Sequence, residues 1–265
     1  MKIAALSDIH GNLQALQAVL VEAQEAGADV IVNLGDIVSG PLWPQQTAAL
    51  LQTLALPTIA GNHERQLLTI PLPRLGASDA HAVRELQPPQ RDWLAALPAT
   101  RWLDAEVFCC HGTPGTDLQY LMETVTADHQ RDGAPGVRAA TAAELAQRLG
   151  DCRARVVLCG HSHVPRTVQL EYDGQAMLVV NPGSVGLQAY DDDHPHTHRI
   201  ELGSPHARWA LLERRADGQW RVEHRETPYD WASAARQAEL NGRGDWADAL
   251  LSGFVGRLER EVLRT

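Results

Sequence analysis

The sequence predicts an α/β fold in which buried strands alternate with helices along the chain. An apolar run over residues 2–6 is followed by leucine and valine at helical spacing, and a second apolar run covers residues 29–34. A strand, a helix and a further strand over this length form a right-handed βαβ unit with two parallel strands. Polar groups that follow parallel strands gather beyond their carboxyl ends, so we expect a functional site at that edge of the sheet.

Further elements extend the alternation toward the C-terminus. Apolar runs predict strands at 57–60, 106–110 and 156–158, and helical periodicity predicts helices at 45–54 and 140–149. The turn pairs Asp173-Gly174 and Asp217-Gly218 predict two β-hairpins, spanning residues 165–180 and 207–225. From about residue 230 to residue 264 the pattern is that of an amphipathic helix.

We expect residues 1–265 to form one domain with two cap-like excursions and a C-terminal helical tail from about residue 230. The excursions are residues 66–105, which carry scattered prolines between short helical pieces, and residues 113–150. The first excursion has no chemical signature of its own. A chain of 265 residues is long enough to bury a sizeable core.

The charge balance excludes several functions. The formal net charge is −10, which argues against binding to a nucleic-acid backbone, because such binding needs a surplus of lysine and arginine. Lys2 is the only lysine, which excludes a Walker-type phosphate loop and nearly every mechanism through a lysine Schiff base. A phosphorylated substrate is compatible with this acidity, because bound divalent cations can reverse the local field.

The sequence also indicates where the protein works. No apolar run approaches the length of a transmembrane helix, and the N-terminal run is too short for a signal peptide before polar Ser7. The four cysteines form no CxxC pair and lie in or near apolar runs, so we expect free, buried thiols. We therefore expect a cytoplasmic protein that does not associate with a membrane.

Five places at or near predicted strand ends carry side chains that can bind a metal. They are Asp8-x-His10, Gly35-Asp36, Gly61-Asn62-His63-Glu64, His111-Gly112 and Gly160-His161-Ser162-His163. In extended backbone, residues two apart point to the same side, so His161 and His163 can converge on one point. Each motif taken singly also fits a structural role, as a helix cap, a turn or a solvent-exposed histidine.

Together the candidate ligands suit two metal ions rather than one. They are two carboxylates, one amide and four imidazoles: Asp8, His10, Asp36, Asn62, His111, His161 and His163. One zinc ion is satisfied by four ligands, whereas two ions bridged by a carboxylate and a water or hydroxide use seven. Mixed oxygen and nitrogen donors favour manganese, iron, zinc, nickel or cobalt over magnesium or calcium. Such a pair activates the bridging hydroxide, and His63 is placed to protonate the leaving group.

The order and spacing of these motifs resemble the calcineurin-like metallophosphoesterase family. The segment Asn181-Pro182-Gly183-Ser184 is similar to that of the bacterial small phosphodiesterase branch. The resemblance implies a four-layer αββα sandwich, with two mixed sheets flanked by helices, and two divalent ions with manganese as the first candidate. It also implies one metal at Asp8, His10, Asp36 and His163, a second at Asp36, Asn62, His111 and His161, and His63 as the acid.

The chain departs from the family's serine/threonine protein phosphatase branch. There, an Asp-Arg-Gly sequence follows the Gly-Asp motif and its arginine grips phosphate, but this chain has Ser39-Gly40-Pro41 at those places. The missing aspartate also leaves His63 without an orienting carboxylate, for which Glu64 is a candidate. Arg65 is a candidate phosphate contact, although an arginine that opens a helix is more often solvated.

We therefore expect a two-metal hydrolase of a small phosphodiester or nucleotide-type substrate. A phosphomonoesterase, a protein phosphatase and a non-catalytic interaction module on the same fold are the alternatives. Pro182 replaces the first glycine of a G-x-S-x-G elbow, so a serine nucleophile is not predicted. The polar loop Asp191–His198 is interpreted as a solvated insertion rather than a further metal site. The oligomeric state is not predicted.

Overall fold

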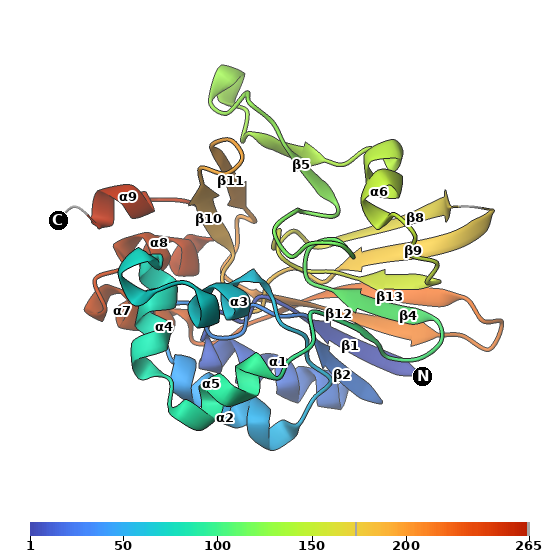
Figure 1. The fold of residues 1–265 in the computed structure, drawn as a ribbon, viewed down its shortest axis with the longest axis horizontal. Helices are drawn as coiled ribbons and strands as arrows, with labels where there is room; N and C mark the ends of the chain where they lie inside the picture. The colour runs from blue at the N-terminus through green and yellow to red at the C-terminus, as the bar shows by residue number, and fades with distance from the viewer. Residues whose placement is uncertain (173, 264–265) are drawn as a thin grey trace.

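Two β-sheets lie face to face in the computed structural model, which describes residues 1–172 and 174–263 (Figure 1). The first sheet comprises β13 (Trp220–Thr227), β12 (Ala207–Arg214), β1 (Lys2–Leu6) and β2 (Val30–Asn33), in that order. The second comprises β3 (Thr100–Trp102), β4 (Val107–Cys110), β7 (Val156–Leu158), β9 (Gln175–Asn181) and β8 (Arg166–Tyr172). Both sheets are mixed. In the first, β1 pairs parallel to β2 and antiparallel to β12. In the second, β4, β7 and β9 are parallel, and the edge strands β3 and β8 pair antiparallel to β4 and β9.

Helices cover both outer faces, so the αββα sandwich implied by the sequence is confirmed. The helices are α1 (Leu13–Glu25), α2 (Pro44–Leu54), α3 (Asn62–Thr69), α4 (Ala77–Glu85), α5 (Pro88–Ala95), α6 (Ala142–Leu149), α7 (Trp231–Leu240), α8 (Gly244–Ser252) and α9 (Glu259–Val262), with 3₁₀ turns η1 (Leu72–Arg74) and η2 (Arg131–Gly133). Two small hairpins, β5 (Glu123–Val125) with β6 (Val137–Ala139) and β10 (Ala189–Asp192) with β11 (His198–Glu201), project beyond the sandwich (Figure 1).

The layers follow from side-chain alternation along the strands. On β1, Ile3 and Ala5 belong to the core between the two sheets, whereas Ala4 and Leu6 belong to the core beneath α1 and α2. The outer face of the second sheet packs against α6, through residues such as Leu145. Parallel strands buried on both faces are near-continuous apolar runs, which is why they could be recognised in the sequence.

Two predicted elements differ in the structure. The strand expected at 57–60 is a single bridge between Asn33 and Thr58, because the chain leaves the sheet edge and the Ala60 N–H donates to the Pro98 carbonyl instead. The C-terminal tail is three short helices rather than one. Glycines in the left-handed conformation, at φ +73° after α7 and φ +71° after α8, end the first two. Residues Asp173 and 264, which fall within the predicted turn and tail, lie outside the described residues.

The remaining structural expectations concern the thiols and the membrane. All four cysteines are free, and Cys109, Cys110 and Cys159 are buried as the sequence predicted, whereas Cys152 is only partly buried. Burial raises the pKa of the Cys109 thiol to about 12, so this group stays protonated and unreactive. Among the described residues, no helix combines the length and apolar character needed to span a membrane.

Candidate metal centre

The loops that follow β1, β2, β4 and β7 meet at one edge of the sandwich. Within the first sheet, the Asp8 N–H donates to the Gly35 carbonyl at 3.0 Å. Within the second, the Gly160 N–H donates to the His111 carbonyl at 2.8 Å. The two sheets are joined where the His161 N–H donates to the Asp8 carboxylate at 3.2 Å. Ligand candidates from distant parts of the chain therefore share one site.

The candidate donor atoms form two adjoining groups. One contains Asp8, His10 and His163 and the other contains Asp36, His111 and His161, and the atoms within each group lie within 4.8 Å of one another. Asn62 joins the second group, since its Oδ1 lies 3.2 Å from His111 Nε2. The groups adjoin where Asp8 Oδ1 lies 4.0 Å from His111 Nε2. The structure thus brings together all seven residues singled out in the sequence.

Five of the seven candidates have left-handed backbone. Their φ angles are 56° at Asp8, 52° at His10, 54° at Asp36, 69° at His161 and 61° at His163. Extended backbone was expected for the pairs spaced one residue apart, and that expectation is wrong. The left-handed conformation is uncommon for residues other than glycine and stores about 1–3 kcal/mol at each position. His161 and His163 accordingly enter different groups instead of converging on one point.

Residues 181–186 hold two of these loops in place. The Asn181 side-chain amide donates to the Gly160 carbonyl at 2.8 Å. The Ser184 hydroxyl and the Gly186 N–H both donate to the Asp8 carbonyl, at 2.8 and 2.9 Å. The Ser184 hydroxyl is therefore committed to the backbone, in agreement with the sequence argument against a serine nucleophile.

Glu64 holds the third loop. Its fully buried carboxylate accepts hydrogen bonds from the N–H groups of Asp36 (2.8 Å), Ile37 (2.8 Å) and Gly61 (2.9 Å). Burial and the charge of Asp36 raise the pKa of Glu64, and these backbone hydrogen bonds oppose that rise. With both oxygens engaged, Glu64 is a support for the backbone of Asp36. The prediction that it orients His63 is wrong.

Three of the four imidazoles are oriented with one nitrogen free for a metal. Nδ1 of His10, His111 and His163 lies 2.8 Å from a backbone carbonyl, of Ser39, Leu34 and Leu187 respectively. A carbonyl can only accept, so Nδ1 carries the proton and Nε2 of the neutral ring keeps its lone pair. Partners of this kind set the tautomer and the direction of a metal-binding histidine.

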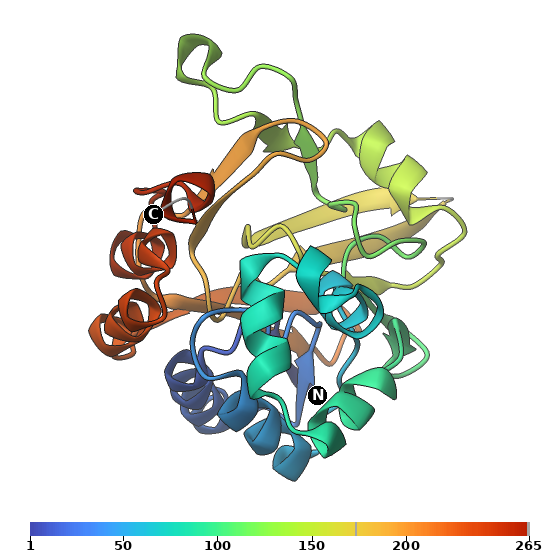
Figure 2. The same ribbon diagram turned by 60° about the vertical axis from the view of Figure 1, so that its left-hand side comes forward.

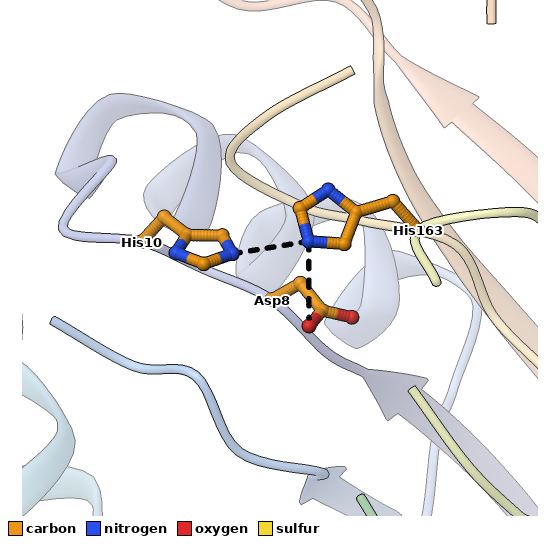
Figure 3. A group of neighbouring side chains, drawn as sticks. All are labelled: Asp8, His10 and His163. Carbon is orange, nitrogen blue, oxygen red and sulfur yellow. Dashed lines mark hydrogen bonds and ion pairs between the residues drawn. The ribbon is translucent and has the colours of Figure 1, made fainter. Parts of the chain in front are cut away.

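In the first group, the free imidazole nitrogens face one another and a carboxylate oxygen, and neutral rings cannot bond these acceptors (Figure 3). His10 Nε2 lies 3.1 Å from His163 Nε2, and Asp8 Oδ1 lies 3.5 Å from the same His163 atom. Two unprotonated nitrogens cannot share a hydrogen bond, so only a proton or a cation satisfies them. In the second group, His111 Nε2 faces Asp36 Oδ2 at 3.0 Å. Both donor sets thus fit a divalent cation with mixed nitrogen and oxygen ligands.

The pKa values of the imidazoles suit metal ligation. Burial lowers the pKa of His10 to about 4 and that of His161 to about 3, so both rings are neutral near pH 7. Burial would also lower the pKa of His111, but the charge of Asp36 and their hydrogen bond raise it to about 9. The proton on His111 Nε2 lies where a metal ion would lie, between this nitrogen and Asp36. The raised pKa is thus a second indication that positive charge stabilises the site.

The two carboxylates differ in their pKa values. Burial raises the pKa of Asp8 to about 7, while the charge of His111 opposes the rise. Burial would raise the pKa of Asp36 as well, but the charges of His111 and His63 hold it well below its ordinary range. Asp36 is therefore ionised at neutral pH, and a neighbouring divalent cation would favour the ionised form of Asp8.

His63 lies beside the two groups and is 29% exposed. Its Nδ1 lies 2.8 Å from Asp79 Oδ1, and its ring meets the His10 ring edge-on at 5.5 Å between centroids. Burial would lower the pKa of His63, but Asp36 and Asp79 raise it to about 10. Asp79 lies in the first turn of α4, within an excursion that was expected to carry no chemistry. It is an orienting carboxylate that the sequence analysis missed.

Arg65 follows on the same helix but engages a carboxylate. Its Nε and Nη2 donate to the two oxygens of Asp117, at 2.7 and 2.8 Å, and its side chain is 44% exposed. The backbone carbonyl of the next residue, Leu118, accepts a hydrogen bond from the His161 imidazole. The pair thus ties α3 to the loop that lines the second group, and a phosphate contact by Arg65 stays a prediction.

Two tyrosines and a histidine complete the wall of the site. The Tyr120 hydroxyl lies 2.7 Å from that of Tyr190 and 3.0 Å from His198 Nε2. The ring of Tyr120 packs on His161 and that of Tyr190 on His163, each at 4.8 Å between centroids. The loop predicted as a solvated insertion is exposed over most of its length, but its last residue, His198, is fully buried.

An αββα sandwich with two groups of candidate metal donors at one edge is the arrangement that the sequence motifs led us to expect. The model of the calcineurin-like phosphoesterase superfamily domain matches residues 1–202, and the chain belongs to this family. An uncharacterized protein of Methanocaldococcus jannaschii is 41% identical over 66 residues, which cover 25% of this chain and only 27% of that relative.

Solved structures resemble the chain over a greater length. The crystal structure of a metallophosphoesterase from Sphaerobacter thermophilus superposes with a TM-score of 0.70 at 23% identity, covering 96% of this chain and 99% of that one. This likeness shows the fold. The structure of an archaeal phosphodiesterase is more distant, with a TM-score of 0.43 at 15% identity over 85% of this chain and 100% of that one.

Replacing Gly186 by alanine tests the backbone support of the site. A Cβ there would lie 1.9 Å from the carbonyl oxygen of Ile9, so the two loops must separate. We expect a loss of about 2 kcal/mol in the free energy of unfolding, measured with urea. Gly115→Ala is the control, because nothing lies within 4 Å of the added Cβ. Equal stability of the two variants would contradict this account.

Proposed function

We propose that the protein is a two-metal hydrolase of small phosphodiester or nucleotide-type substrates. The observation that carries the proposal is the pair of opposed lone pairs on His10 and His163, 3.1 Å apart, beside an equally acceptor-rich second group. We assign one ion to Asp8, His10, Asp36 and His163 and the other to Asp36, Asn62, His111 and His161. Manganese is the first candidate, with iron, zinc, nickel and cobalt as the others.

The chemistry divides between the ions and the side chains. When bound, two divalent ions lower the pKa of water at the site and neutralise the charge that develops on a phosphoryl group. His63 stands beside the proposed ligands. Since its Nδ1 bonds Asp79, Nε2 is the ring nitrogen that is left to bond the substrate. It therefore donates a proton to the departing alkoxide, a role worth about 10²–10⁴ in rate. Asp79 keeps the ring in the donating orientation.

The charge around the site favours a diester over a monoester. A phosphodiester carries one negative charge near neutral pH, whereas a monoester carries up to two and gains more from a gripping arginine. Ser39-Gly40-Pro41 supplies no such arginine, and the guanidinium of Arg65 is already bound bidentately to Asp117. These features also weigh against a protein phosphatase. The complete ligand set with an oriented His63 weighs against a non-catalytic interaction module.

Single histidine variants test the assignment of two ions. We expect His161→Ala and His163→Ala each to reduce bound manganese from about two ions per chain to about one, measured by elemental analysis after gel filtration. The control is His194→Ala, in the exposed loop, whose side chain is 94% exposed and which should retain both ions. Wild-type protein that takes up a single ion would contradict the assignment.

Removal of the metal tests the reaction itself. We expect the chelator-treated protein to hydrolyse bis-p-nitrophenyl phosphate at less than about one hundredth of the manganese-restored rate, because the ions supply the nucleophile and the charge neutralisation. The restored enzyme should also act faster on this diester than on p-nitrophenyl phosphate. Undiminished hydrolysis without metal would refute the two-metal mechanism, and a faster monoester would refute only the preference for diesters.

A further inference from the structure

The C-terminal helices α7 and α8 lie outside the residues matched by the family model, yet they pack against the site. They lie together along one side of the molecule (Figure 2). The Asn241 side chain donates to the Pro41 carbonyl at 2.7 Å, in the loop that follows β2. The Trp246 ring meets the ring of the ligand candidate His10 edge-on at 5.9 Å. A segment beyond the family domain is therefore in direct contact with the catalytic edge.

Arg243, between these two helices, is buried and bound on every side. Its Nε and Nη2 donate to the Asp245 carboxylate, at 2.9 and 2.6 Å, and Nη2 also donates to Glu259 at 2.9 Å. The remaining terminal nitrogen, Nη1, donates to the Ser78 hydroxyl at 2.8 Å. The side chain is 5% exposed, and breaking such a buried network is costly, so the guanidinium has one orientation.

Ser78 connects this network to the proposed acid. It directly precedes Asp79 in the first turn of α4, and the Asp79 carboxylate holds Nδ1 of His63. Asp79 is 4% exposed, so its side chain has little room to change conformation. A shift of the helix end would therefore move the carboxylate away from His63. The first turn of α4 is thus held by two hydrogen bonds, one between Ser78 and Arg243 and one between Asp79 and His63.

We propose that Arg243 and Ser78 are positioning residues for proton donation by His63. Together they fix the first turn of α4, so that Asp79 aims the imidazole at the leaving oxygen. The inference rests on the proposed function, since it assumes that His63 is the acid. It assigns the C-terminal helices a part in the reaction, through the hydrogen bond from Arg243 to Ser78, the peptide link from Ser78 to Asp79 and the hydrogen bond between Asp79 and His63.

A purely structural role for Arg243 makes a different prediction. If Arg243 only anchored the C-terminal helices, its loss would slow every substrate alike, because the whole site would loosen. Poor aim of a general acid instead affects only substrates whose leaving group needs a proton. An alkoxide needs one, whereas p-nitrophenolate leaves readily without it. The dependence of the loss on the leaving group therefore separates positioning from anchoring.

The test uses the full-length, manganese-loaded protein with two diesters, bis-p-nitrophenyl phosphate and a dithymidine monophosphate whose leaving group is an alkoxide. We expect His63→Ala to lower kcat on the alkoxide substrate by about 10²-fold or more. Ser78→Ala and Arg243→Lys should lower it by about 5- to 50-fold, and each should change kcat on the nitrophenyl diester less than about 2-fold. Lysine retains the charge but not the fork that reaches Ser78 and Asp245 together.

Ser204→Ala is the matched control, because the Ser204 hydroxyl accepts from another buried arginine, Arg208, at 3.2 Å and lies on another loop. Both its rates should equal those of the wild type. Urea unfolding checks that each variant is folded, and Ser78→Ala remains informative if Arg243→Lys is not, since it leaves the bonds of Arg243 to Asp245 and Glu259 in place.

The outcomes separate the two proposals. If His63→Ala slows both diesters equally, the acid role of His63 fails and the positioning inference fails with it. If His63→Ala is selective but Ser78→Ala and Arg243→Lys slow both substrates equally, or neither, the proposed function stands and the positioning inference is overturned. Selective losses in all the variants except Ser204→Ala support the inference.

Discussion

The constraint on which the site depends is a surplus of electron pairs at one edge of the sandwich. Backbone carbonyls accept hydrogen bonds from Nδ1 of His10, His111 and His163, so the three Nε2 atoms are aimed inward among carboxylate and amide oxygens. Such an arrangement is unfavourable in a buried place unless positive charge enters it. The loops would relax away from one another if the surrounding backbone allowed it. Much of the structure near this edge prevents that.

The restraint comes from hydrogen bonds between loops that are distant in the sequence. Ser184 and Gly186 hold the carbonyl of Asp8, Asn181 holds that of Gly160, and Glu64 receives three N–H groups around Asp36. Each of these groups bonds to the backbone of a neighbouring loop. Their role is to keep residues with positive φ in place, and this is how a folded protein sustains local strain at a functional site. Chemistry and support are thus divided between different side chains.

Most of the fold could be predicted, and so could the meeting of the seven ligand candidates at one edge, because strand ends such as those before Asp8 and His161 are recognisable as apolar runs followed by polar residues. Contacts between side chains on different elements could not be predicted. Asp79 meets His63 across 16 positions, on a helix whose docking no periodicity reveals. Glu64 looked like a partner of His63 because it is adjacent, yet its helical position turns it toward the backbone. The one-residue spacing of ligands misled in the same way, since it presumes a strand where the chain is already turning.

The left-handed backbone at five of the candidate ligand positions also limits which residues such a site can accept. Asparagine, aspartate and histidine are the side chains other than glycine that enter this region most readily, and they are also competent ligands. The positive φ angle and the need for a metal-binding side chain therefore favour the same few residue types at these positions, which are Asp8, His10, Asp36, His161 and His163. Exchanges among asparagine, aspartate and histidine would change the donor atoms, and so the preferred ion, at little conformational cost. A switch to cysteine or glutamate would meet resistance from the main chain before any metal is involved.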